Sequence, residues 1–478
     1  MAYNPDVRAQ QQLVEYQKFV EIQGDSRFPP VSTISWEYAD TTTAAVSTLN
    51  IYPKYGVITY LANASDINLT LSASNVTTTP NPTQIDAFNR LRVSNPLTLF
   101  DSSHRYRDNS LWSTLSANGG SVAFNQTQGL MDLNVTNASG ASALRETTKV
   151  FAYQPGKSLL IMNTFVMAAS ADGLVQRVGY FGNDNGIYFQ MDGDTISFVE
   201  RSIVTGSLVN TVCARSLWNG DKLDGSGPSE ITLDLTKAQI MWLDIEWLGV
   251  GTIRTGFVVN GQFIVCHSFH HANIINSTYI TTASLPLRYE IFNKTATSGS
   301  KTLKQICSTV ISEGGYQLNG LQQSVGIPIG SPYRLTTKET FYPVVSIRLK
   351  SSPNRQDAIV IVSAISLLGK TAGDTFNWQV RNAAKTSGGA WVSADDDSAV
   401  EYNITATSLT GGRVLGSGYF STTQQTGGGI DILKEALFRN QLERNSFTGE
   451  CFEMTIVAAA NNNNSDLFAS IDWEEISR

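Results

Sequence analysis

Two carboxylates occupy alternate positions of one apolar segment, Trp242-Leu-Asp-Ile-Glu-Trp-Leu248. Residues two apart in a β-strand project from the same face, so Asp244 and Glu246 are expected to lie side by side, with Trp247 next to them. Glycoside cleavage with retention requires two carboxyl groups about 5 to 5.5 Å apart, one as nucleophile and one as acid. The segment therefore supplies three candidate glycan contacts, Asp244, Glu246 and Trp247.

The strand pattern also resembles that of retaining glycosidases built on a concanavalin-type sandwich, which is Glu-x-Asp-x-Glu. In this chain Trp242 stands where that pattern has its first carboxylate. The remaining pair cannot fill both catalytic roles, so we expect no enzyme activity. We interpret the two acids as salt-bridged on a sheet face, with Arg254 as a partner.

Three of the four histidines form a cluster, His267, His270 and His271, beside Cys266. Imidazoles this close could bind zinc or nickel. On a strand, however, His267 and His271 share one face while His270 points away, and no acid lies nearby in sequence. We favour structural hydrogen bonding, with a metal site as the alternative, and we expect no cofactor.

The composition restricts the class of protein. Hydrophobic residues make up 41% of the chain, which allows real cores, whereas charged residues make up only 16%. This is below the usual ~25%, and Ser, Thr, Asn and Gly fill the difference, as is typical of β-sandwich and fibre-like proteins. The net charge of -7, without any run of Lys and Arg, argues against binding to nucleic acid.

The densest mixture of charged and apolar side chains runs from Asp86 to Tyr106. Arg90 and Arg92 are two residues apart and would project from one face of an extended segment, with Asp86 and Asp101 as nearby acids. A connector with docked apolar side chains and anchored guanidinium groups fits this pattern, as does a subunit contact. The residues we expect to matter for assembly are Phe88, Arg90, Leu91, Arg92 and Phe100.

This block resembles a segment near the N-terminus of structural proteins from tailed bacteriophages, especially marine cyanophages, in which the pattern D-A-F-G-R-L-R-V-S-x-P-x-T-L-F-D recurs. Asn89 takes the place of the glycine. The stretches 285–291 and 305–316 add to the resemblance. It implies a virion protein and brings no catalytic residues with it.

At 478 residues the chain has room for about three domains. Short apolar runs separated by Gly, Asn and Asp turns predict a mainly β protein of several antiparallel β-sandwich or jelly-roll domains, with a short N-terminal helix. The predicted division is 1–30, helix and linker that could anchor the chain; 31–83, small β module; 84–106, connector block; 107–318, central jelly-roll or concanavalin-like sandwich; 319–335, linker; and 336–478, C-terminal β domain.

The sequence thus predicts a phage virion structural protein, part of a fibre or of a tail or head appendage, which assembles with other virion proteins and attaches to the host. A capsid decoration protein and a glycan-binding or glycan-cleaving sandwich module are the alternatives. We expect synthesis in the host cytoplasm, because no signal peptide or apolar run of ~18 residues is present. The resemblance implies a homo-oligomer, preferably a trimer, and a host-surface glycan as a further partner.

Overall fold

The computed structural model describes residues 35–38, 44–48, 85–88, 90–315, 320–422 and 441–477. The chain divides into two units, residues 1–78 and 79–478, and each is described by itself. In the first unit, strands β1 (Ser35–Tyr38) and β2 (Ala44–Thr48) pair antiparallel. The predicted helix within 1–30 lies outside the described residues.

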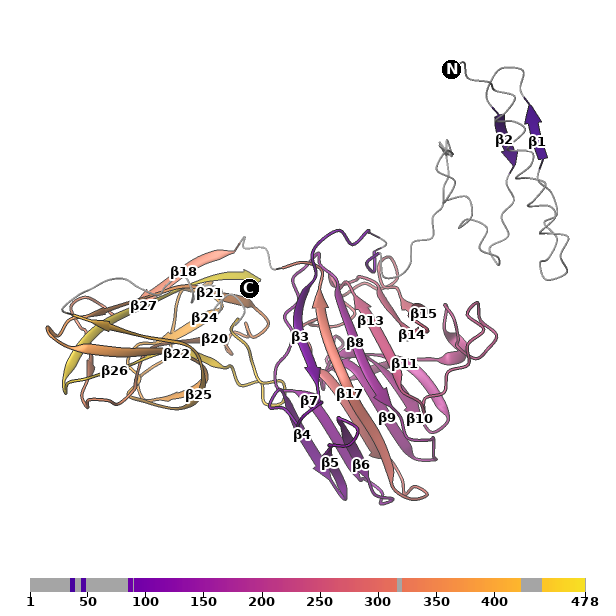
Figure 1. Cartoon of the computed structure of the whole chain (residues 1–478), viewed down its shortest axis with the longest axis horizontal. Coiled ribbons are helices and arrows are strands. Elements are labelled where there is room, and N and C mark those ends of the chain that lie inside the picture. Colours follow the sequence, from indigo (N-terminus) through magenta and orange to yellow (C-terminus); the bar gives the residue numbers. More distant parts are fainter. Residues whose placement is uncertain are drawn as a thin grey trace, which may run out of the picture. The chain divides into compact units, whose positions relative to one another are not determined.

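The second unit begins with a sandwich of two antiparallel sheets (Figure 1). One sheet has the order β12-β11-β10-β9-β16-β7-β4, and the other has the order β15-β14-β13-β8-β17-β6-β5, with β3 paired to β17. The strand bounds are β3 (Leu97–Ser103), β4 (Trp112–Ala117), β5 (Gly120–Asn125), β6 (Leu130–Val135), β7 (Ser142–Thr147), β8 (Leu159–Val166), β9 (Leu174–Phe181), β10 (Gly186–Asp192), β11 (Thr195–Ser202), β12 (Val209–Ala214), β13 (Gln239–Ile245), β14 (Ile253–Val259), β15 (Gln262–Phe269), β16 (Leu287–Asn293) and β17 (Lys301–Ser312).

Alternation of side chains between the two faces builds the core of this first sandwich. In β8 every second residue from Leu159 to Phe165 is buried, whereas the residues between them are half-buried. Phe189 and Phe257 meet edge to face from opposite sheets, with ring centroids 5.2 Å apart. The period of two therefore decides which residues face the core and which face outward.

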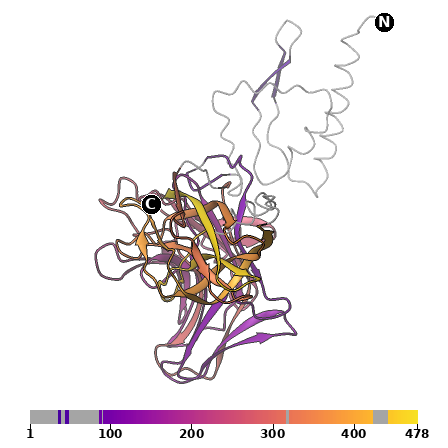
Figure 2. The same cartoon turned by 90° about the vertical axis from the view of Figure 1, so that its left-hand side faces the viewer.

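A second sandwich follows, with a six-stranded sheet in the order β23-β24-β20-β26-β22-β25 and a four-stranded sheet in which β27 pairs with β18, β19 and β21. Figure 1 shows the strands of each sandwich as extended ribbons beside one another, and Figure 2 turns the view so that the second sandwich, in orange and yellow, faces the reader. The strand bounds are β18 (Leu321–Gly326), β19 (Tyr333–Leu335), β20 (Tyr342–Leu349), β21 (Ile359–Gly369), β22 (Thr375–Ser387), β23 (Val392–Ser393), β24 (Val400–Asn403), β25 (Ser408–Ser421), β26 (Glu453–Ala460) and β27 (Ser465–Ser477).

The predicted mainly β fold of antiparallel sheets is confirmed. Among the described residues the one helical element is a 3-10 turn, Arg215–Leu217. None of the described residues form a helix with the length and apolar character that a membrane crossing requires.

Two of the predicted boundaries are wrong. The expected linker 319–335 contains β18 and β19, which both pair with β27, and Pro328, Gly330 and Pro332 lie in the turn between these strands. The expected connector 84–106 contains β3, which pairs with β17 inside the first sandwich. In both segments backbone pairing with a distant strand outweighs a local composition that is typical of turns.

Candidate functional site

The candidate carboxylates lie on the outer face of the eight-stranded sheet. Met241, Leu243 and Ile245 of β13 point into the core, so Asp244 and Glu246 point the opposite way. Both acids are nevertheless 0% exposed. The predicted shared face is therefore correct, and something other than sheet packing must cover these carboxylates.

Asp244 is covered by two guanidinium groups. Arg254 lies directly opposite on β14 and donates from Nε at 3.1 Å and from Nη2 to Asp244 Oδ2. Arg92 donates from Nη2 to Asp244 Oδ1 at 2.7 Å. The predicted ion pair with Arg254 is confirmed, and Arg92 adds a second one from a remote segment.

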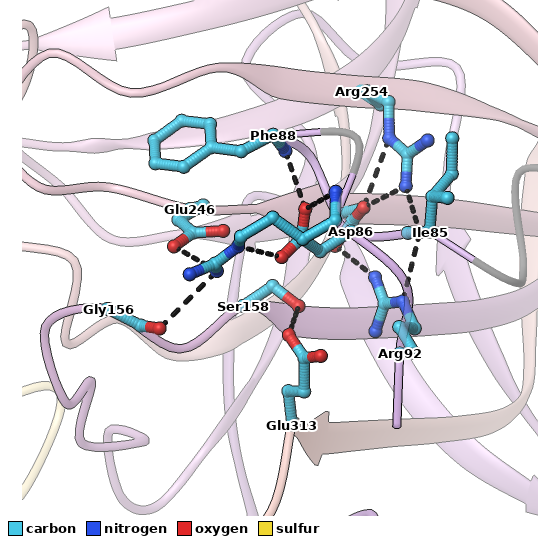
Figure 3. Close-up of polar contacts among 11 residues, drawn as sticks. Ile85, Asp86, Phe88, Arg92, Gly156, Ser158, Glu246, Arg254 and Glu313 are labelled. Carbon is cyan, nitrogen blue, oxygen red and sulfur yellow. Dashed lines mark hydrogen bonds and ion pairs between the residues drawn. The ribbon is translucent and has the colours of Figure 1, made fainter. Parts of the chain in front are cut away.

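Glu246 is covered by Arg90, whose Nη2 lies 2.6 Å from Glu246 Oε1. The same guanidinium donates from Nε to Asp86 Oδ2 at 2.6 Å (Figure 3). Asp86 Oδ1 accepts the backbone N–H groups of Phe88 and Arg90 at 2.8 and 2.9 Å, which fixes the turn that carries the arginine. We call Asp86, Arg90, Arg92, Asp244, Glu246 and Arg254 the arginine clasp.

Backbone contacts complete the clasp. The Ile85 carbonyl accepts Arg92 Nε at 3.0 Å and Arg254 Nη2 at 2.7 Å. Ile85 also bridges to Leu91, and both Ile85 and Ala87 are buried. Residues 85–88 and 90–92 are thus held against the outer face of the sheet.

The clasp contains three acids and three arginines, so its charges balance. Burial raises the pKa of Glu246 to about 7, and the charge of Asp86 acts in the same direction while Arg90 opposes it. Burial lowers the pKa of Arg90, but hydrogen bonds and charges from Asp86 and Glu246 outweigh this effect and raise it. Removal of the buried acid Asp244 would leave Arg92 and Arg254 without their counter-charge.

The residues predicted for assembly have three different environments. Arg90 and Arg92 bind acids of their own chain, while Leu91 between them is 63% exposed and Phe88 is 37% exposed. Phe100 is buried in the core against Phe151, with ring centroids 5.0 Å apart. The expectation that Phe100 makes an assembly contact is wrong, because alternation along β3 turns it inward.

Two of the three predicted glycan contacts, Asp244 and Glu246, are not accessible in this structure, whereas Trp247 is half-buried. Asp244 and Glu246 lie beneath the clasp, so a sugar cannot reach either carboxylate in this conformation. Trp247 packs edge to face on Tyr153, and its backbone N–H donates to the Tyr153 hydroxyl at 3.1 Å. All three residues therefore make contacts within the chain.

The histidines make separate hydrogen bonds. His271 Nε2 lies 2.6 Å from Glu200 Oε2 and Nδ1 lies 2.6 Å from the Gly251 carbonyl. His267 Nδ1 accepts the Asn219 N–H at 3.3 Å, and the His270 ring meets the Thr252 hydroxyl at 3.3 Å. Within the part of the chain that the structure describes, no group of His, Cys, Asp and Glu could hold a metal ion. Sequence offered no signal for Glu200, which lies 71 residues before His271.

A surface pocket of about 530 Å³ adjoins the clasp. Sequence analysis missed its contributors Lys157 and Glu313, which come from turns far apart in the chain. Lys157 Nζ donates to the Gly315 carbonyl, and Glu313 Oε2 accepts the Ser158 hydroxyl at 3.2 Å. The lining residues are Arg90, Leu91, Val93, Ser94, Asn95, Gly156, Lys157, Glu313, Gly314 and Gly315.

No family model matches this chain, and no curated protein matches it in sequence. Solved structures similar to it include a protein of unknown function from Shewanella oneidensis MR-1, with 10% identity, 48% of this chain and 90% of that one covered, and a TM-score of 0.31. A second similar structure is a GH16 protein of a Bacteroides ovatus mixed linkage glucan PUL, in complex with a product. It is 10% identical, the match covers 44% of this chain and 99% of that one, and the TM-score is 0.32. The lectin UEA-II, complexed with galactose, is 11% identical, the match covers 45% of this chain and 98% of that one, and the TM-score is 0.28. At these values no residue role transfers to this chain.

Replacement of Asp244 by Ala tests the charge balance of the clasp. It leaves Arg92 and Arg254 without their shared carboxylate, so we expect the free energy of unfolding in urea to fall by about 3 to 5 kcal/mol. Asp101→Ala is the control, because Asp101 is an exposed acid of β3, and its effect should stay within about 0.5 kcal/mol. Equal unfolding midpoints for the two variants would contradict the proposed charge balance.

The buried His267 predicts a loss of stability in acid. Burial lowers its pKa to about 4, whereas the unfolded chain binds this proton near pH 6.5. The unfolded state therefore gains protons first as the pH falls from about 6.5 to 4, and the free energy of unfolding decreases. His267→Asn keeps an acceptor for the Asn219 N–H and removes the titration.

The measurement is the difference in unfolding free energy between wild type and His267→Asn across this pH range. Taking the difference cancels Glu246, whose raised pKa contributes stability that is present below about pH 4.5 and lost as the pH rises through 7. Relative to the variant, wild type should lose about 1 to 3 kcal/mol between pH 6.5 and 4. A constant difference would show that His267 does not cause the loss.

Proposed function

We propose that this chain is a non-catalytic structural protein of a tailed phage particle, in which the arginine clasp fixes residues 85–88 and 90–92 to the outer face of the first sandwich. The clasp is the observation that carries the proposal. Asp86, Arg90 and Arg92 are the first acid and the two arginines of the pattern that resembles virion proteins, and all three make ion pairs in the clasp. The clasp thereby supplies a physical reason for the pattern on which the resemblance rests.

The chemistry of the clasp supports a mechanical role better than a catalytic one. Asp244 and Glu246 are buried and each accepts at least one guanidinium hydrogen bond, so neither is available as nucleophile or acid in this conformation. The same contacts resist movement of residues 85–92 away from the sheet, because separation would leave charged groups unpaired. A segment that is held in one position just before the first sandwich suits a subunit that must keep its orientation in a large assembly.

Between its two anchored arginines the clasp presents an apolar side chain. Leu91 is 63% exposed and Val93 is 89% exposed, whereas Arg90 and Arg92 are turned toward the sheet. Contacts with other virion proteins through these side chains would use a surface that is already rigid, so little conformational entropy is lost on assembly.

The proposal predicts that the chain is a component of purified particles. Mass spectrometry of gradient-purified particles of the phage that encodes it should find the chain in a constant ratio to the major capsid protein across the particle peak. Its presence in the soluble part of the lysate alone would refute the proposal. Release of reducing sugar from oligosaccharides by the purified chain would separately refute the non-catalytic part.

A second candidate function is glycan binding in the pocket beside the clasp. Arg90, Lys157, Glu313 and Asn95 line it with groups that can hydrogen-bond sugar hydroxyls, and Leu91 and Val93 add apolar surface. This site differs from the predicted one, since Asp244 and Glu246 do not line it. Its open position on the surface would suit attachment to a host glycan.

Lys157→Ala tests this second candidate. Wild type is first screened on an array of neutral and acidic oligosaccharides, and the strongest ligand is titrated calorimetrically against both proteins. Loss of one charge-assisted hydrogen bond should weaken binding about tenfold. Lys237→Ala, at an exposed lysine outside the pocket, should bind as wild type does. Absence of any array signal, or equal affinity of Lys157→Ala and wild type, would rule this pocket out.

A further inference from the structure

The edge strand β12 has an open side. It pairs with β11 on one side, and among the described residues no strand pairs with its other side. Leu208, Val209 and Val212 are 50%, 45% and 50% exposed. At its end the Cys213 carbonyl accepts Trp218 Nε1 at 3.1 Å, so the open stretch covers residues 208–212.

Natural sheets usually protect an open edge with charged residues, proline or a bulge. The stretch from Ser207 to Ala214 contains no charged residue and no proline. Its pairing with β11 runs from Val209 to Ala214 without a register shift, so no bulge interrupts the strand. An apolar, regular and unprotected edge is a template for the addition of another strand.

The outer face of this sheet carries an apolar cluster that continues to the edge. Phe181, Tyr188 and Val199 are buried together there, and Val199 lies directly opposite Val212. Cys213 points into the core, so Asn210 and Val212 lie on the outer face, and Leu208 precedes them by the same period of two. A strand added at this edge would extend the cluster past Val212.

We propose that β12 pairs antiparallel with β12 of a second copy of this chain, about a two-fold axis at Asn210. In this register Leu208 lies opposite the partner's Val212, and Val212 lies opposite the partner's Leu208. Asn210 meets the partner's Asn210 on the axis. Each copy thus places an exposed aliphatic side chain against one from the other, and an isologous contact of this kind closes after two copies.

Charge favours a second copy as the occupant. The chain has a net charge of -7, so contact between two copies is least opposed where neither copy brings a charge, and residues 207–214 carry none. The opposite edge of the same sheet, β4, offers only Leu115 as an exposed large apolar side chain, at 57%. The inference deepens the proposed structural role by naming a self-contact, and its two-fold symmetry differs from the trimer that the resemblance implies.

The test is the solution mass of the full chain by sedimentation equilibrium, at concentrations up to about 100 μM, where even a weak specific dimer is populated. Wild type should have twice the mass of 52.0 kDa. Val212→Lys places a charge opposite an aliphatic side chain and should weaken the dimer at least about tenfold. Leu115→Lys makes the same change on β4 and should leave the dimer intact.

A mixture of two variants tests the register itself. Leu208→Glu and Val212→Lys should each be monomeric, because a homodimer of either variant loses both aliphatic pairs. A 1:1 mixture should recover the doubled mass, since the mixed pair keeps one aliphatic pair and sets the introduced carboxylate opposite the introduced ammonium group. Circular dichroism and urea unfolding of each variant check that the fold persists.

A wild-type mass of one copy at every concentration, or a dimer or trimer that Val212→Lys leaves unchanged, would overturn the inference. Failure of the mixture to recover the dimer would overturn the register. A monomeric chain that is nevertheless found in purified particles would leave the proposed function standing. A β12 dimer that is absent from particles would refute the proposed function alone.

Discussion

A buried carboxylate must be neutralised or hydrogen-bonded, and two of them beside one another on one sheet face set the constraint on which the candidate site depends. Asp244 and Glu246 lie on the outer face of β13, where sheet pairing supplies only Arg254 as a counter-charge. The other two guanidinium groups belong to Arg90 and Arg92. Their ion pairs with Glu246 and Asp244 bind this part of the chain to the sheet, because separation would leave buried charges unpaired. The position of Arg90 and Arg92, the pocket that Arg90 and Leu91 line and the exposure of Leu91 all follow from that attachment.

Sequence alone predicted the parts of this site that depend on local periodicity. Residues two apart in a strand share a face, which correctly placed Asp244 with Glu246 and Arg90 with Arg92. Asp86 lies four residues before Arg90, and this short separation allowed their ion pair to be predicted. The contacts of Arg90 with Glu246 and of Arg92 with Asp244 span 156 and 152 residues, and no local pattern encodes which strand a remote segment will cover.

The same reasoning explains the errors. Phe100 stands in a dense charged and apolar block, which suggested a contact surface, but its face is decided by the pairing of β3 with β17. In 319–335 the glycines and prolines suggested a linker, although two short strands flank that turn and find a partner in β27. The mainly β fold was predictable because composition and turn spacing reflect it throughout the chain, whereas pairing between distant strands has no such signature.

The long sequence separation within the clasp has a consequence for biosynthesis. A ribosome releases Asp86, Arg90 and Arg92 some 150 residues before the strand that carries their acids. Arg90 and Arg92 therefore cannot make these ion pairs until β13 has emerged. Non-local contacts of this kind slow folding, because the loop-closure entropy is lost before the contacts form. The clasp therefore cannot close before β13 and β14 have emerged, although β16, β17 and the second sandwich are still to follow.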